Sequence, residues 1–247
     1  MAASLELTES KLSQHFHKVE ALLRQNFVKD LSLDIAWTQN PLAAGLGARG
    51  CEPTERNRGG RVFVVPAWKI DKSKKAWLGF REEWAVAAPA GATKRFSFKS
   101  INLTIHFGAV GEANKPQMFR AEWAGYAKWI GDNYSFQAGN AGHPHWQFDA
   151  LDSLSEKQPA LIAQQYADAI RENDSPKSAV DFLPKSDQKS EVDYLKTARK
   201  LSRIHFASAA MWWKQPDHSH SPENAKEIEV WLSSLITYLS EELERLN

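Results

Sequence analysis

Two histidines, an amide and a carboxylate alternate with apolar residues within residues 139–151 of this 247-residue chain. The four polar residues are His143, His145, Gln147 and Asp149. In a β-strand, alternate residues point to opposite faces, so these side chains would share a polar face while the residues between them face a core. Such a polar face can form a metal site, an acid–base site or a hydrogen-bonded network.

Polar residues in two preceding stretches alternate in the same way. They are Asn102, Thr104 and His106 within residues 95–110, and Arg120 and Glu122 within residues 117–130. If consecutive strands pair, one sheet face collects all of these side chains. This convergence is the main functional prediction from the sequence.

One divalent metal is a candidate ligand of this face. Side chains at positions i and i+2 of a strand lie about 6 to 7 Å apart, so His143 and His145 could share a metal if a neighbouring strand supplied a third ligand. The candidates for that ligand are His106, Glu122, Asp149 and His205. The H-x-H spacing has low specificity, and histidines that only hydrogen-bond to carboxylates are the structural alternative.

The stretches that carry these residues are predicted to be strands of an antiparallel meander. Alternating apolar residues predict strands at 31–37, 62–65, 76–88, 95–110, 117–130 and 143–151. No helix is predicted between the last five, which favours an α+β fold: a sheet of five to six strands, an N-terminal helix and C-terminal helices packed on the sheet. The apolar positions change from even to odd after Phe98, which predicts a β-bulge near Lys99 and Ser100.

Helical periodicity marks both ends of the chain. Residues 8–27 predict an amphipathic helix capped by Thr8, on which His15 and His17 are expected to be exposed to solvent. The chain is expected to form one domain, sheet-rich over 28–151 and helix-rich over 152–247.

Three helices are predicted in the C-terminal part. Residues 156–171 and 191–201 are the first two candidates. The last helix is predicted to start at Pro222 with Ser221 as its cap, and its broad apolar face could serve the core or an oligomer interface.

A glycine-rich segment at residues 45–50 matches the G-x-G-x-x-G pattern of dinucleotide-binding loops. A dinucleotide site needs a helix directly after the glycines, and the polar run that follows predicts none. We expect instead a long mobile loop that exposes Arg49, Arg56 and Arg58 and could bind a partner.

Charge is nearly balanced overall, at +1, but it is unevenly distributed. Residues 49–99 hold twelve Lys or Arg against five Asp or Glu, whereas residues 149–193 hold ten acids against five bases. The basic stretch contains Trp68, Trp77 and Trp84, and cations interleaved with aromatic rings can bind nucleic acid. Alternatively, a basic face meets an acidic protein while the tryptophans lie in the core. The candidate partner-binding residues are Arg49, Arg56, Arg58, Lys72, Lys74 and Lys75.

Composition favours a cytoplasmic protein without membrane spans. No apolar run approaches the roughly 18 to 20 residues that cross a bilayer, and the N-terminus lacks a secretory signal pattern. The single cysteine, Cys51, excludes an internal disulfide and a cysteine-based zinc site, which fits a reducing compartment.

Two functions follow from these observations. The first is a non-catalytic or accessory binding subunit of a larger cytosolic assembly, which contacts protein, a second copy of the chain or nucleic acid through the basic, tryptophan-containing region. The second is a metal-dependent phosphoester hydrolase or nuclease. In it His143, His145 and Asp149 would hold a divalent metal that activates water, and Arg120 would stabilise the developing charge.

Overall fold

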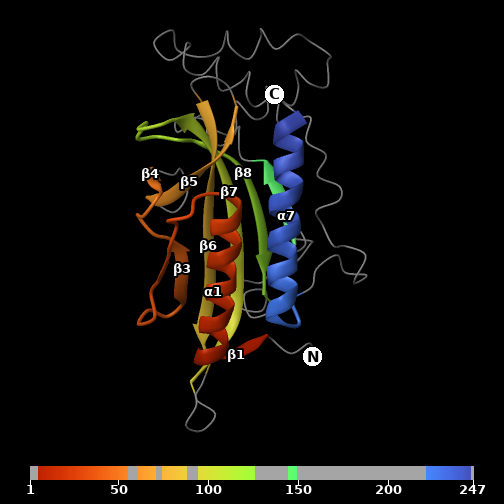
Figure 1. The fold of residues 1–247 in the computed structure, drawn as a ribbon. Helices are drawn as coiled ribbons and strands as arrows, with labels where there is room; N and C mark the ends of the chain where they lie inside the picture. The colour runs from red at the N-terminus through yellow and green to blue at the C-terminus, as the bar shows by residue number, and fades with distance from the viewer. Residues whose placement is uncertain are drawn as a thin grey trace, which may run out of the picture.

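One antiparallel sheet with helices on one face makes up the described part of the molecule (Figure 1). The structure is a computed structural model that describes residues 5–54, 61–70, 74–87, 94–125, 144–148 and 221–245. Within these residues the sheet has nine strands, and an N-terminal and a C-terminal helix pack on it. The α+β prediction is therefore confirmed, although the sheet has more strands than the five to six predicted.

Two long central strands, β6 and β7, connect the rest of the sheet. The strand path runs through β2 (Leu33–Ile35), β3 (Leu42–Leu46), β6 (Lys74–Val86), β7 (Arg95–Ala109), β8 (Gln117–Ala124) and β9 (His145–Phe148). Off this path lie β1 (Glu6–Thr8), β4 (Glu52–Thr54) and β5 (Val62–Lys69). Strand β6 pairs with β3, β5 and β7, and β7 pairs with β1, β6 and β8.

Helix α1 (Glu9–Asn26) forms where the sequence predicts it. Thr8 is its N-cap, and the Thr8 hydroxyl accepts a hydrogen bond from Lys11 N at 3.4 Å. The buried stripe consists of Leu12, His15, Phe16, Val19 and Leu23. His17 is exposed as expected, but the same prediction for His15 was wrong, because His15 lies on the buried stripe.

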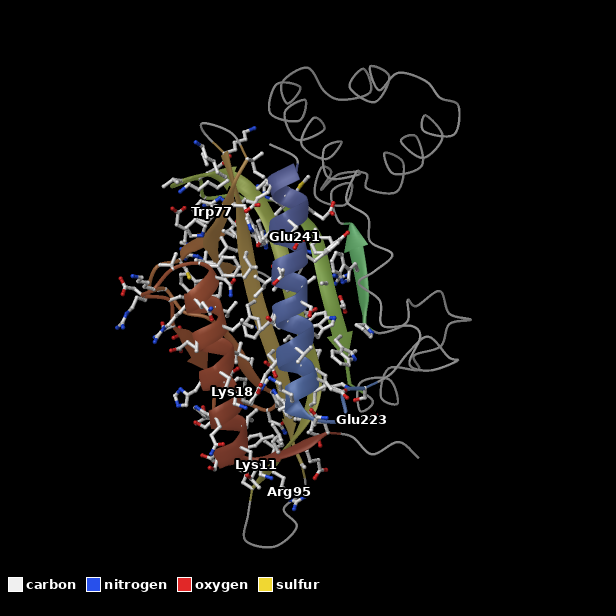
Figure 2. The ribbon with its side chains drawn as sticks, turned by 45° about the vertical axis from the view of Figure 1, so that its right-hand side comes forward. Lys11, Lys18, Trp77, Arg95, Glu223 and Glu241 are labelled. Carbon is white, nitrogen blue, oxygen red and sulfur yellow. The ribbon has the colours of Figure 1, made fainter. Side chains whose placement is uncertain are left out.

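Helix α7 (Ala225–Arg245) runs beside α1 and in the same direction (Figure 2). Its cap is Asn224, whose Oδ1 accepts a hydrogen bond from Glu227 N at 3.1 Å, so the predicted cap at Ser221 was wrong. Its buried apolar residues are Ile228, Trp231, Leu232, Leu235, Ile236, Leu239 and Leu243. No helix in the described residues is long and apolar enough to span a membrane. The helix candidates at 156–171 and 191–201 lie outside these residues.

Strand β7 contains the predicted bulge. Glu83 of β6 pairs with Ser100 while the next residue, Trp84, pairs with Phe98, so Lys99 is the extra residue. The bulge keeps the apolar residues of both halves of the strand on the face that the helices cover. They are Phe96, Phe98, Ile101, Leu103, Ile105 and Phe107, and all six are buried.

The glycine-rich segment is partly strand, so the prediction of one long loop was wrong. Gly45 lies in β3, where it pairs with Asp34 of β2 and Arg81 of β6, and β4 follows at Glu52–Thr54. Alanine and glycine have weak strand propensity, and pairing on both sides holds β3 in the sheet. Arg49 is exposed as expected. Arg56 and Arg58 lie outside the described residues.

Deletion of Lys99 should destabilise the protein far more than its replacement. Without the extra residue, the apolar side chains of one half of β7 would turn to the opposite face. Loss of burial of two phenylalanines would lower the free energy of unfolding by about 3 to 6 kcal/mol. Lys99→Ala keeps the register and should change it by less than about 1 kcal/mol. Urea unfolding compares the variants, and equal stabilities would contradict this role of the bulge.

Candidate functional site on the polar face of the sheet

Those of the predicted polar residues that lie in described strands occupy positions on the sheet face opposite the helices. Two rows of directly opposed residues cross this face: Arg81, Asn102, Glu122 and His145 form one, and Gly79, Thr104, Arg120 and Gln147 form the next. Directly opposed residues have Cβ atoms about 5 Å apart, so each row juxtaposes groups from four strands. We call this surface the polar face.

The pairing of β9 places its alternate residues on this polar face. Trp146 belongs to the opposite, core side, where its ring lies 5.1 Å from that of Phe119 and 5.2 Å from that of Tyr238 on α7. By alternation, the positions of His145 and Gln147 belong to the polar side. The register places them next to Glu122 and Arg120, respectively.

Several predicted site residues fall outside what the structure describes. His143, Asp149 and His205 lie outside the described residues, and only the backbone of His145 is described. Among the described residues, no group of three or more His, Cys, Asp or Glu side chains is arranged to hold a metal ion. The metal-binding and catalytic assignments therefore stay predictions.

Two arginines on this face are each paired along their own strand. Arg120 Nε lies 2.9 Å from Glu122 Oε2, and an Arg81 guanidinium nitrogen lies 2.8 Å from Glu83 Oε1. The Arg81 side chain is 54% exposed, whereas the Glu122 side chain is only 9% exposed. The polar face therefore becomes less accessible to solvent from β6 towards β8, and the Arg120–Glu122 pair is held in a fixed, largely enclosed position.

The predicted metal ligand His106 is engaged by two neighbours. Its Nδ1 lies 2.9 Å from Lys115 O, and its Nε2 lies 3.0 Å from Thr104 Oγ1. A carbonyl oxygen only accepts, so Nδ1 carries the proton and, in the neutral ring, Nε2 accepts from the Thr104 hydroxyl. Coordination of a metal through Nε2 would require displacement of this hydroxyl. The side chain is fully buried, which fits a structural role.

A buried lysine beside this histidine was missed by sequence reasoning. Lys115 Nζ lies 2.8 Å from Glu52 Oε2 and 4.6 Å from the centre of the Trp77 ring, and it also donates to Glu112 O. Its backbone N–H donates to Thr54 Oγ1 at 2.7 Å. The contacts of Lys115 with Glu52 and Thr54 join β4 to the connection between β7 and β8. A lysine within a polar run carries no periodic signal, so nothing in the sequence marked it as buried.

The single thiol is not an activated nucleophile. Burial, with the negative charge of Asp34 adding to it, raises the pKa of Cys51 to about 11. A thiol with this pKa is almost entirely protonated at neutral pH, and the thiolate is the reactive form.

Replacement of Gly79 should show how tightly the Thr104–His106 pair is held. A Cβ at Gly79 would lie 2.4 Å from Thr104 Oγ1, so Gly79→Ala should cost about 1 to 3 kcal/mol in unfolding free energy. Gly45→Ala is the control, because its Cβ would meet Phe80 O at an ordinary 3.5 Å. Urea unfolding measures both. The cost at Gly79 should fall in a Thr104→Ala background, and an unchanged cost would refute the clash.

Comparison with known proteins gives no indication of function for the polar face or for the rest of the described surface. No protein-family model, curated protein or solved structure matches the chain. The function proposed below therefore rests on which groups the fold brings together.

Proposed function

We propose that this chain is an accessory binding subunit that contacts an acidic protein partner through the basic end of the β5–β6 pair. One observation carries the proposal: Lys69 of β5 and Lys75 of β6 are directly opposed, and Lys74 is the next residue. Like charges directly opposed across a sheet are destabilising. A negatively charged partner would offset this repulsion on binding, so the arrangement favours association with an acidic surface.

An acid close to this end of the sheet is already paired with another lysine. Glu52 pairs with Lys115, whose Nζ lies over the ring of Trp77, two residues after Lys75 in β6. The charge of Glu52 is therefore balanced within the chain and adds little negative potential beside Lys75.

The tryptophans of the basic region favour a protein over a single-stranded nucleic acid as the partner. Trp77 and Trp84 are buried, and Trp68 Nε1 donates a hydrogen bond to Ser240 Oγ at 3.0 Å on α7. The Trp68 ring also packs on that of Phe27, with 5.5 Å between centroids. Stacking of unpaired bases needs open ring faces, and these rings are committed to the core and its edge.

Charge reversal at Lys74 and Lys75 should weaken the binding of an acidic probe. We expect a fluorescent poly-glutamate peptide to bind the wild type, with a steep decrease as salt rises, and about tenfold more weakly to the Lys74→Glu, Lys75→Glu variant. Fluorescence anisotropy measures both affinities.

The matched control is Lys11→Glu, at the end of the molecule opposite Trp77, which follows the two lysines in β6 (Figure 2). This control should bind like the wild type. Equal losses in both variants, or no loss in either, would reject the proposal. Binding of a dT oligonucleotide but not of the peptide, with the same lysine dependence, would replace the acidic protein by nucleic acid.

A metal-dependent phosphoester hydrolase is the second candidate function. The observation that favours it is the register of β8 and β9, which sets Glu122 opposite His145 and Arg120 opposite Gln147. A histidine and a carboxylate in neighbouring positions can share a divalent metal, and an arginine beside them can stabilise charge on a phosphoryl group.

Calorimetric titration with Mn²⁺ and Zn²⁺ tests this second function. We expect one ion per chain in the wild type and an affinity at least about tenfold lower in His145→Ala, because a ligand is lost. The control His17→Ala, at an exposed position on α1, should bind like the wild type. The wild type and His17→Ala should hydrolyse bis-p-nitrophenyl phosphate, and His145→Ala should hydrolyse it more slowly. Equal metal affinities in the three proteins would argue against a site at His145.

A further inference from the structure

A second buried polar cluster lies on the other side of the sheet, between the sheet and the two helices. His15 of α1 has its Nε2 2.9 Å and 3.2 Å from the two carboxylate oxygens of Glu82 on β6. Its Nδ1 lies 3.4 Å from Oε1 of Glu229 on α7. One imidazole therefore contacts a side chain of the sheet and a side chain of the neighbouring helix. Neither function proposed above uses this cluster.

The hydrogen-bond pattern indicates a charged imidazole. Both ring nitrogens of His15 face carboxylate oxygens, which only accept hydrogen bonds when ionised. A neutral imidazole has one N–H and can donate to only one of the two carboxylates. Only the imidazolium can donate to Glu82 and Glu229 together, so the hydrogen bond from His15 on α1 to Glu229 on α7 depends on the second proton.

The surrounding charges point the same way. Glu82 faces the ring from β6, Glu229 faces it from α7, and Lys18 of α1 has its Nζ 3.3 Å from the same Glu229 oxygen. Trp84 Nε1 donates to Glu82 Oε1 at 2.8 Å. With His15 protonated, two cations face two carboxylates. Without that proton, the side chains of Glu82, which is fully buried, and Glu229 face a neutral ring.

We propose that His15 is a proton-dependent switch that strengthens the attachment of the N-terminal half of α7 to α1 while it is protonated and loosens that attachment when the proton is lost. In the neutral state a ring-nitrogen lone pair of His15 would face the Glu229 carboxylate. The two groups would repel each other, and the helices would lose the buried ionic contact between them and keep only the more exposed Lys18–Glu229 pair.

The direction of the pH dependence follows from the electrostatics. Burial alone would lower the pKa of His15, but the facing carboxylates of Glu82 and Glu229 outweigh it and raise the pKa above its ordinary value. The stabilisation is therefore fully present below the ordinary pKa of a histidine, near 6.5, and is lost as pH rises through the raised value in the folded protein.

A groove beside the His15–Glu229 contact opens this part of α7 to solvent. A groove of about 380 Å³ between the helices is lined by Lys18, Val19, Leu22, Lys226, Glu229, Val230, Ser233 and Ser234. The helices are therefore not in close contact on the outer side of the His15–Glu229 pair, and water reaches Glu229. Ile228 and Leu232 in this half are also buried, so loss of the proton loosens the half without detaching it. Further along α7, Ser240 accepts the Trp68 hydrogen bond, which does not depend on His15.

Hydrogen exchange read by mass spectrometry tests the switch. After correction for the intrinsic pH dependence of exchange, protection of residues 226–234 should be constant at low pH. It should fall by about tenfold per pH unit above the folded-state pKa of His15, as expected for the loss of one proton. Protection of residues 239–245 should not change. A pH-independent profile over 226–234 in the wild type would overturn the proposal.

Two variants test whether the pH dependence comes from protonation of His15. In Glu229→Gln the side-chain amide can donate to a neutral His15, so the pH dependence of protection over residues 226–234 should become weaker, while Glu82, which still faces the ring, keeps part of it. His17→Gln removes an exposed histidine from the same helix and should keep the wild-type dependence. A dependence in Glu229→Gln as large as that of the wild type, or its loss in His17→Gln, would contradict the assignment to His15. The His15 ring resonances in NMR should titrate above pH 6.5, and titration below it would also overturn the proposal.

Discussion

The central constraint on this fold is that β6 and β7 must present apolar side chains to the helices along their whole length. Strand alternation alone cannot satisfy it, because the apolar residues of β7 change parity partway along the strand. The extra residue at Lys99 resets the alternation and keeps Phe96 and Ile105 in one core. The same alternation places Asn102 and Thr104 on the opposite side. The polar face is thus a direct consequence of how the core is built.

Helices and strands in which large apolar residues recur at regular spacing could be predicted from the sequence. Helix α1, the strands that become β5 to β9 and the bulge at Lys99 all follow from the spacing of large apolar residues. Strand β3 was missed because its Leu-Ala-Ala-Gly-Leu segment has few residues that favour strands, and its partners on both sides decide its conformation. For the polar face, the sequence predicted which residues alternate, but only the pairing register shows that Glu122 lies opposite His145 and Arg120 opposite Gln147.

The burial of His15 and Glu82 could have been predicted from the spacing of apolar residues. His15 falls on the apolar stripe of its helix, and Glu82 alternates with Phe80 and Trp84 on the core side of β6. A titratable residue on an apolar stripe needs a buried partner. Two such residues of opposite charge in one core are therefore candidates to pair. Their separation of 67 residues hid the pair, because the sequence does not say which strand lies beneath the helix.

The placement of α7 also has a consequence for synthesis on the ribosome. This helix comes last among the described residues, yet Trp231 packs against Trp123 with 5.8 Å between ring centroids, and Leu232 and Leu235 complete the core that the strands begin. Among the described residues, β1 to β9 and α1 all precede α7 in the chain, and α1 is the helix that then covers the apolar sheet face. Long-range closure of this kind is slow. The core formed by the described residues is therefore completed only after α7 has emerged.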